Sequence, residues 1–290
     1  MKKRIGIDIG GTKIQLGLVL EDKILKKIKA PTPPSPKDGL LLIETLLNEL
    51  TKGEEIAGIG IGVAGFIDIE KGEIISSPNL PFWNGFPLKK AMEERLECPI
   101  FVDNDVNCAT LAEARFGAGA GKKNIIGIFV GTGIGSGMVI DGKLIHGAAC
   151  SGIEIGHITI NPKGAVCMCG RRGCLEAYSG GLAIMKYARH RVRDVDEVVR
   201  ASEEGKEWAN LSLRRAGRAL SLAIANLITT LSPDIVILGG GVIKAAPTIF
   251  EMVKTQVPLI VLPVAMRGVQ IEVAKFKEEA GFLGASLLVK

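Results

Sequence analysis

Short runs of aliphatic residues open the chain, and their spacing predicts three strands joined by tight turns. The runs end at paired glycines and at an acidic turn, which are typical boundaries of strands. They cover residues 4–9 (RIGIDI), 14–20 (IQLGLVL) and 24–29 (ILKKIK). We therefore expect a three-stranded meander at the start of the chain.

After the meander, helix and strand patterns alternate. A proline cluster ends the third strand, and Asp38 then caps an apolar-periodic stretch that predicts a helix to about Leu50. The glycine-interleaved run 56–64 predicts a buried strand, which closes a β-β-β-α-β unit. Residues 65–87 are rich in proline and glycine and predict a loop with an exposed Trp83. Beyond this loop we expect helix 88–97, strand 100–103 and helix 107–116.

A second strand, glycine turn, strand pattern occupies residues 125–145 and echoes the opening of the chain. The later patterns predict an amphipathic helix at 207–231, a strand at 234–238, a helix opened by residues 239–241, and a C-terminal helix at 278–288. Two glycine turns between paired strands, one near the start of each half, resemble the α/β architecture of actin, Hsp70 and hexokinase. That two-lobed ATPase fold consists of duplicated ribonuclease H-like domains.

The resemblance implies an N-terminal lobe at 1–117 and a larger lobe at 118–275. It also implies that residues 276–290 return to the first lobe and that a nucleotide lies in the cleft between the lobes. The length agrees, because 290 residues exceed a comfortable single core.

Composition limits the function classes. The 36 basic and 31 acidic side chains give a net charge of only +5, and the basic ones are scattered, so we expect no nucleic-acid partner. No apolar run reaches the roughly 18 residues of a membrane span, and no signal-peptide core follows Met1. We therefore expect no membrane association and a cytoplasmic location.

One histidine and three of the six cysteines fall within residues 157–174. They are His157, Cys167, Cys169 and Cys174. Four imidazole and thiolate ligands are what a tetrahedral structural zinc site needs. Reduced cysteines without a ligand are the alternative, and Cys98, Cys108 and Cys150 are interpreted in that way, as small core or surface residues. For the cluster itself we predict structural Zn²⁺.

The neighbours of these ligands form a family signature. Residues 154–157 read EIGH and residues 167–176 read CMCGRRGCLE. Together they resemble the ROK family of sugar kinases and repressors, most of all its bacterial-type glucokinases. The resemblance implies that Glu154 and Glu176 contact sugar hydroxyls. It also implies that His157 orients the sugar site with one ring nitrogen while the other binds zinc.

Two glycine-rich turns are candidate phosphate loops, because glycines let backbone N–H groups approach a phosphate without a Cβ in the way. In residues 8–13 (DIGGTK), Asp8 would hold Mg²⁺ through water. The candidate ATP contacts there are Gly10, Gly11, Thr12 and Lys13. In residues 131–137 (GTGIGSG) they are Gly131, Thr132, Gly133 and Gly135, and after the later strand they are Gly239, Gly240 and Gly241, which would face the adenine and ribose.

Simpler interpretations exist for two of these segments. Residues 8–13 could form a plain hairpin turn, and residues 239–241 an ordinary glycine-rich helix start. Neither phosphate loop has the spacing GxxxxGK[ST], and neither opens a crossover helix with an acidic ribose contact. This excludes the P-loop and Rossmann classes.

The sugar side of the site is carried by two further segments. Residues 102–107 (VDNDVN) place carboxylates 103 and 105 on opposite sides of a strand end. The resemblance implies that Asn104 binds sugar and that Asp105 is the general base that takes the proton of the attacking hydroxyl. The alternative for Asp105 is a helix cap.

Residues 77–80 (SPNL) resemble the corresponding segment of ROK glucokinases. This implies that Asn79 binds a sugar hydroxyl and that Gly65 lies at the floor of the sugar site. Trp83 either packs beside that site or anchors its loop. Ile153 stands where many members have glycine, which leaves the identity of the sugar more open.

Taken together, the resemblance implies ATP-dependent phosphorylation of a hexose, glucose first, in glycolysis, by a homodimer that uses ATP, Mg²⁺ and Zn²⁺. Fructose, mannose, allose and N-acetylmannosamine are alternative acceptors. A non-catalytic sugar-sensing regulator and an ATPase that acts by conformational change are alternative functions. Repressors of the family carry a DNA-binding domain before the first strand, whereas here that strand begins at Ile5, so we expect an enzyme.

Overall fold

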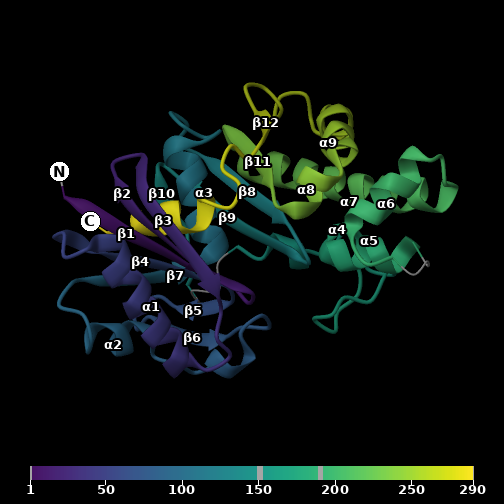
Figure 1. Cartoon of the computed structure of the whole chain (residues 1–290). Helices are drawn as coiled ribbons and strands as arrows, with labels where there is room; N and C mark the ends of the chain where they lie inside the picture. The colour runs from purple at the N-terminus through teal and green to yellow at the C-terminus, as the bar shows by residue number, and fades with distance from the viewer. Residues whose placement is uncertain (1, 149–152, 189–191, 290) are drawn as a thin grey trace. The chain divides into compact units, whose positions relative to one another are not determined.

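The computed structural model describes residues 2–148, 153–188 and 192–289, which form two compact units (Figure 1). The first unit contains the described residues of 1–121, 137–153 and 276–290. The second contains those of 122–136 and 154–275. These units differ from the expected lobes in residues 118–121 and 137–153, which group with the first unit.

A five-stranded sheet in the order β3-β2-β1-β4-β7 forms the centre of the first unit. The first three strands are the expected antiparallel meander, and β1, β4 and β7 run parallel. The elements of this unit up to residue 121 are β1 (Lys3–Ile9), β2 (Lys13–Leu20), β3 (Lys23–Pro31), α1 (Pro36–Thr51), β4 (Ile56–Val63), β5 (Phe66–Asp68), β6 (Glu73–Ser76), η1 (Pro81–Trp83), α2 (Leu88–Glu93), β7 (Ile100–Asn104) and α3 (Asp105–Phe116).

A second five-stranded sheet has the order β10-β9-β8-β11-β12, which repeats the topology of the first. In both, a meander is followed by two strands parallel to its first strand. The boundary between the units falls within β9. The remaining elements are β8 (Ile125–Val130), β9 (Ile134–Ile140), β10 (Lys143–Leu144), η2 (Ile155–His157), α4 (Glu176–Ser179), α5 (Gly181–Ala188), α6 (Val195–Glu203), α7 (Glu207–Leu231), β11 (Ile235–Gly239), α8 (Gly241–Ala245), α9 (Pro247–Ile260), β12 (Gln270–Val273) and α10 (Ala280–Ser286).

Helices cover both faces of the first sheet. Helix α1 buries one side through leucines and isoleucines at helical spacing, among them Leu40, Ile43 and Leu47. Helix α10 packs on β1 and β4 from the other side together with α3, as the yellow segment in Figure 1 shows. In the second unit the long helix α7 packs against α9, α4, α5 and α6. The hydrophobic core therefore lies between each sheet and its helices.

The segment predicted as a loop at 65–87 is more ordered than its composition indicates. It contains the β5–β6 hairpin and the short helix η1. Trp83 is completely buried rather than exposed, with its ring against Gly39 of α1 and edge-on to Phe86 at 6.0 Å. The prediction of an exposed tryptophan was wrong, because helix α1, distant in sequence, covers the ring.

Smaller corrections concern helix ends. Helix α1 begins at Pro36 after the N-cap Ser35, so Asp38 lies in the first turn and does not cap it. Helix α2 ends at Glu93, and α10 is confined to seven residues. Cys108 is buried and Cys98 partly buried, whereas Cys150 lies outside the described residues.

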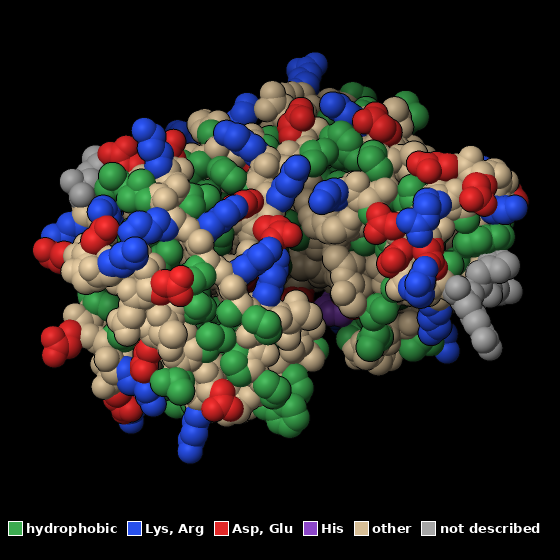
Figure 2. Space-filling model, in the orientation of Figure 1, with side chains coloured by type: hydrophobic (Ala, Val, Ile, Leu, Met, Phe, Trp, Pro, Cys, Tyr) green, Lys and Arg blue, Asp and Glu red, His purple; other side chains and the backbone are tan. Residues whose placement is uncertain are grey.

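Basic and acidic side chains are intermixed over the face seen in Figure 2. Within the described parts of the chain, every helix is too short or too polar to cross a lipid bilayer.

Candidate active site and metal centre

The carboxyl ends of three parallel strands bring the acidic residues of the first unit together. Asp8 on β1 lies opposite Gly62 on β4, and Gly62 lies opposite Asp103 on β7. Asn104 and Asp105 follow directly at the end of β7. Functional side chains of parallel sheets collect at this edge because the strands all end there and loops begin.

Asn104 is the N-cap of α3. Its Oδ1 accepts hydrogen bonds from the backbone N–H groups of Val106 (2.8 Å) and Asn107 (3.1 Å). Its Nδ2 donates to the carbonyl of Gly65 at 2.9 Å. The capping role that was the alternative for Asp105 therefore falls to Asn104. The carboxylate of Asp105 accepts a hydrogen bond from the adjacent backbone N–H of Val106 at 2.9 Å, and hydrogen bonds from its own N–H and from the side chain of Asn104 also favour its charged form.

Burial raises the pKa of two carboxyls at this edge, those of Asp8 and Asp105. It raises the pKa of Asp105 above its ordinary value. The pKa of Asp8 is raised to about 7, first by burial and then by the negative charge of Asp105, although Lys13 and Gln15 act in the opposite direction. A carboxyl with a raised pKa is a better proton acceptor near neutral pH, which suits a general base.

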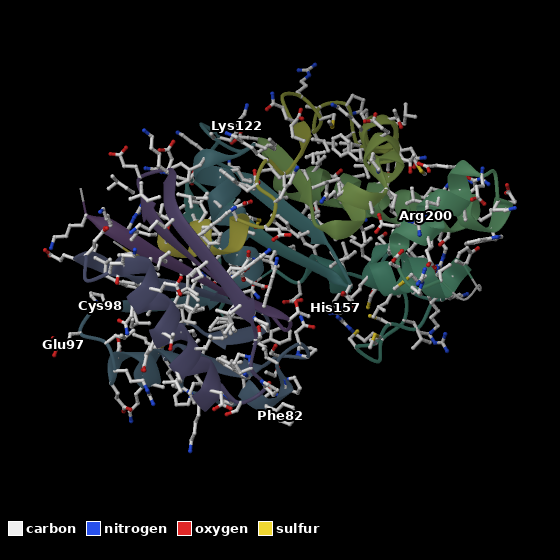
Figure 3. The ribbon with its side chains drawn as sticks, viewed as in Figure 1. Phe82, Glu97, Cys98, Lys122, His157 and Arg200 are labelled. Carbon is white, nitrogen blue, oxygen red and sulfur yellow. The ribbon has the colours of Figure 1, made fainter. Side chains whose placement is uncertain are left out.

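The DIGGTK turn meets the SPNL segment. A Cβ added to Gly11 would lie 2.6 Å from the carbonyl oxygen of Asn79, so only glycine allows this approach. The side chain of Asn79 is exposed beside Phe82, which is 73% exposed and labelled in Figure 3. Lys13 forms an ion pair with Glu278 at 2.9 Å. The first phosphate turn and the expected sugar loop are therefore in contact within the first unit.

In the second unit, the GTGIGSG loop holds Glu176. The backbone N–H of Ile134 donates to Oε2 of Glu176 at 2.9 Å. Gly133 approaches the same carboxylate so closely that a side chain at this position would collide with it. The carbonyls of Gly131 and Thr132 accept from the first N–H groups of α5, at 2.9 and 3.1 Å. This loop therefore contacts a residue expected to bind sugar.

The EIGH segment, residues 154–157, contacts the same loop. The N–H of Ile155 donates to the hydroxyl of Ser136 at 3.1 Å. Burial raises the pKa of Glu154, the positive charge of His157 lowers it, and the negative charge of Glu176 raises it further. These influences show that Glu154, His157 and Glu176 lie near one another.

The four predicted metal ligands converge. The ligand atoms of His157, Cys167, Cys169 and Cys174 all lie within 4.8 Å of one another. The two closest recorded pairs, Cys169 Sγ with Cys174 Sγ and Cys167 Sγ with His157 Nδ1, are each 3.7 Å apart. In Figure 3, His157 lies beside the yellow sulfur atoms of this loop. A tetrahedral zinc with Zn–S distances of about 2.3 Å separates its sulfurs by about 3.8 Å, so the cluster fits zinc.

The environment of the cysteines also suits a cation. The backbone N–H of Arg171 donates to the sulfur of Cys169 and lowers the pKa of that thiol to about 6. Burial raises the pKa of Cys174 to about 12. Because thiolates bind zinc, occupation by the metal would release the proton that burial otherwise retains.

The adjacent parallel strands β8 and β11 end at the expected nucleotide contacts. Gly239 pairs with Phe129, which places Gly240 and Gly241 next to the start of the GTGIGSG loop. Gly240 has a φ of +92° and lies against the backbone of Val130, a position that favours glycine. A Cβ added to Gly131 or to Gly241 would meet no atom within 4 Å. These glycines leave room for a ligand at this edge of the second sheet.

A profile of the ROK family matches residues 4–290. The chain belongs to the ROK family. It is 36% identical over 309 residues to a glucokinase of Thermotoga maritima, covering 99% of this chain and 97% of that one. The predicted family is therefore confirmed.

Two solved ROK structures are also similar. A ROK hexokinase from Thermus thermophilus has a TM-score of 0.89 and 33% identity, over 99% of this chain and 97% of that one. A ROK family glucokinase from Streptomyces griseus, in complex with glucose and AMPPNP, has a TM-score of 0.83 and 31% identity, over 99% and 98%. These neighbours confirm the predicted two-lobed hexokinase-like fold.

The structure brings the predicted site residues of this ROK protein together in two sets. The first unit holds Asp8, Gly10, Gly11, Thr12, Lys13, Gly65, Asn79, Asn104 and Asp105. The second holds Gly131, Thr132, Gly133, Gly135, Glu154, His157, Glu176, Gly239, Gly240, Gly241 and the three cysteines.

Sequence reasoning assigned no role to Ser136 or His146. Ser136 accepts the N–H of Ile155, and His146 contacts Asp103. The position of Ser136, a polar residue within a glycine-rich loop, was a sequence signal for its role. No local signal marks His146, because its partner lies 43 residues away.

Proposed function

We propose that this ROK protein transfers the γ-phosphoryl group of ATP to the C6 hydroxyl of glucose. The observation that carries the proposal is the position of Asp105 at the carboxyl edge of the first sheet, with a raised pKa and with helix capping left to Asn104. The names of the relatives, glucokinase and ROK hexokinase, support the acceptor class.

The proposed reaction uses the chain's own groups for positioning and for one proton transfer. Asp105 accepts the proton of the attacking hydroxyl, while Glu154, His157 and Glu176 bind the other hydroxyls. The glycine turns at 8–13 and 131–137 hold the phosphates of ATP through backbone N–H groups. Phosphoryl transfer needs little covalent help from the protein, so orientation and electrostatic stabilisation carry most of the rate enhancement.

Two metal ions belong to the proposal. Asp8 would hold Mg²⁺, which neutralises charge on the transferred phosphoryl group when it is bound. A dication favours the carboxylate form of Asp8 over the protonated form that burial favours. His157 and the three cysteines would hold zinc in a structural role, fixing the ring of His157 next to the sugar-binding glutamates.

A coupled assay of the purified protein with Mg-ATP and a panel of hexoses tests the proposal. The panel contains glucose, fructose, mannose, allose, N-acetylmannosamine and N-acetylglucosamine. We expect the highest kcat/KM for glucose, and we expect Asp105→Asn to lower kcat by about 10²- to 10⁴-fold with little change in KM. Asp22→Asn, in the exposed β2–β3 turn, is the matched control and should retain full activity.

Two outcomes would contradict the proposal. Turnover of another hexose with a higher kcat/KM would change the acceptor, and binding of sugar without turnover of any hexose would point to a regulator. The expected homodimer and cytoplasmic location stay predictions. Light scattering of the purified protein measures the first.

A further inference from the structure

A buried carboxylate lies directly behind the proposed general base. Asp103 is only 1% exposed, and both of its oxygens are engaged. Oδ1 accepts from the backbone N–H of Asn104 at 2.7 Å and from Nδ2 of Asn107 at 2.9 Å. Oδ2 contacts Nε2 of His146 at 2.7 Å. The proposed reaction gives this group no task, yet a buried carboxylate is costly unless it is paired.

The partners of Asp103 come from three elements of the first unit. Asn104 ends β7, Asn107 lies in the first turn of α3, and His146 follows β10. The side chain of Asp103 therefore connects the end of β7, the start of α3 and the β9–β10 hairpin through hydrogen bonds. Asp105 and Val106 lie between the first two partners in the sequence.

The hairpin that carries His146 is itself packed on α3. A Cβ added to Gly137 of β9 would lie 2.5 Å from Oγ1 of Thr110, and the N–H of Ile145 donates to the carbonyl of Met138 at 2.9 Å. His146 therefore reaches Asp103 from a fixed backbone. Its side chain is 30% exposed, so the ring is held from one side and reachable by solvent from the other.

Charge favours the same arrangement. The hydrogen bond to Asp103 raises the pKa of His146. Asp8 on β1 and Asp105 and Cys108 on α3 are further ionisable groups at this strand edge. The charges of Asp103, Asp105 and Asp8 add to burial in raising the pKa of Cys108, which places all three carboxyls around that thiol. Against these acidic groups, the ring of His146 contacts Asp103 at 2.7 Å and is positively charged when it is protonated.

We propose that His146 is a positioning residue for phosphoryl transfer. By donating to Asp103, it holds the turn at 103–105 in the conformation in which Asp105 faces the acceptor hydroxyl. The inference rests on the proposed kinase function and adds to it a residue that contacts neither sugar nor nucleotide in that proposal. Its effect should therefore appear in kcat, whereas substrate binding should change little.

Three variants of the hairpin test this. His146→Leu removes the donor, and we expect kcat for the best hexose to fall about tenfold to a hundredfold with KM values within about twofold. His146→Gln keeps a donor near the position of Nε2 without the charge, and it should restore kcat to within about threefold of wild type. Lys143→Gln removes an exposed positive charge from the same hairpin and should have no effect.

An NMR titration of the imidazole tests the hydrogen bond on which the proposal depends, whereas the change in kcat without KM and its recovery in His146→Gln separate positioning from a purely structural role. The pKa of His146 should lie above the ordinary histidine value in the wild type and fall towards it in Asp103→Asn. If Asp103→Asn does not fold, the wild-type titration still tests the hydrogen bond, and the kinetics of the His146 variants test the positioning role.

Three outcomes would overturn the positioning role of His146. Unchanged kcat in His146→Leu, or a lower thermal stability with unchanged kcat, overturns the positioning role while the kinase proposal stands on Asp105→Asn. Equal losses in the Leu and Gln variants also overturn it, because the donor is then not the cause. Absence of turnover by the wild type on every hexose overturns the kinase proposal and the inference with it.

Discussion

Replacing Asp8 by asparagine should change how stability depends on pH. In the folded chain the pKa of Asp8 is about 7, whereas the ordinary value is 3.8. Burial is the main cause and the charge of Asp105 the second. The folded chain therefore binds this proton more tightly than the unfolded chain does between pH 4 and pH 7. Stability from this group is fully present below pH 4 and is lost as the pH rises through 7.

The magnitude follows from the two pKa values. They differ by about 3 pH units, and each unit corresponds to about 1.4 kcal/mol, so the full effect is about 4 kcal/mol. Asparagine has nearly the same shape and does not ionise, so Asp8→Asn lacks this penalty at high pH. The free energy of unfolding of the variant, relative to that of the wild type, should therefore increase by about 4 kcal/mol between pH 4 and pH 8. This difference includes any change in the pKa of Asp105 that the substitution causes.

Urea unfolding of both proteins at several pH values, without Mg²⁺ or nucleotide, measures the difference. Carboxyls with lowered pKa values, such as Glu54 and Asp68, change stability in the opposite direction. They are the same in both proteins and cancel in the difference. Asp22→Asn, at an exposed position of the β2–β3 turn, is the matched control. A pH-independent difference for Asp8→Asn would refute the reasoning.

Mg²⁺ connects this prediction to the proposed function. If Asp8 holds the ion, binding of Mg²⁺ near pH 7 should release a proton, because the cation favours the carboxylate. Calorimetry with Mg-ATP in buffers of different ionisation enthalpy should detect this proton in the wild type and not in Asp8→Asn. Equal proton release by the two proteins would place the ion elsewhere.

Two further predictions concern the second unit. Gly133→Ala should push the carboxylate of Glu176 away from its loop and raise KM for both ATP and sugar by about tenfold or more; steady-state kinetics with unchanged KM values would contradict this contact. Cys169→Ser should lose zinc and, through a misplaced His157, sugar affinity, whereas Cys98→Ser should retain both. Metal analysis and sugar titration check it, and normal zinc content with normal sugar affinity in Cys169→Ser would refute it.

Local patterns in the sequence determined much of the fold. The first meander, the helix at 207–231 and the strand at 234–238 are found where the spacing of apolar residues predicts them, to within a residue or two, since these elements bury a regular set of side chains. The metal cluster was predictable for a related reason. Three of its ligands lie within eight residues, so a short glycine-containing loop is enough to bring them together.

The tertiary structure decided what depends on partners distant in sequence. Trp83 is buried because α1 covers it, and Asn104 caps α3 while its amide also reaches Gly65. The contact of His146 with Asp103 spans 43 residues, and that of Glu176 with the GTGIGSG loop spans 42. Such contacts follow from strand register and helix packing, which no single segment specifies. The sequence by itself therefore determined most of the candidate residues, whereas tertiary packing decided which residues hold one another in place and added His146, which no local pattern marks.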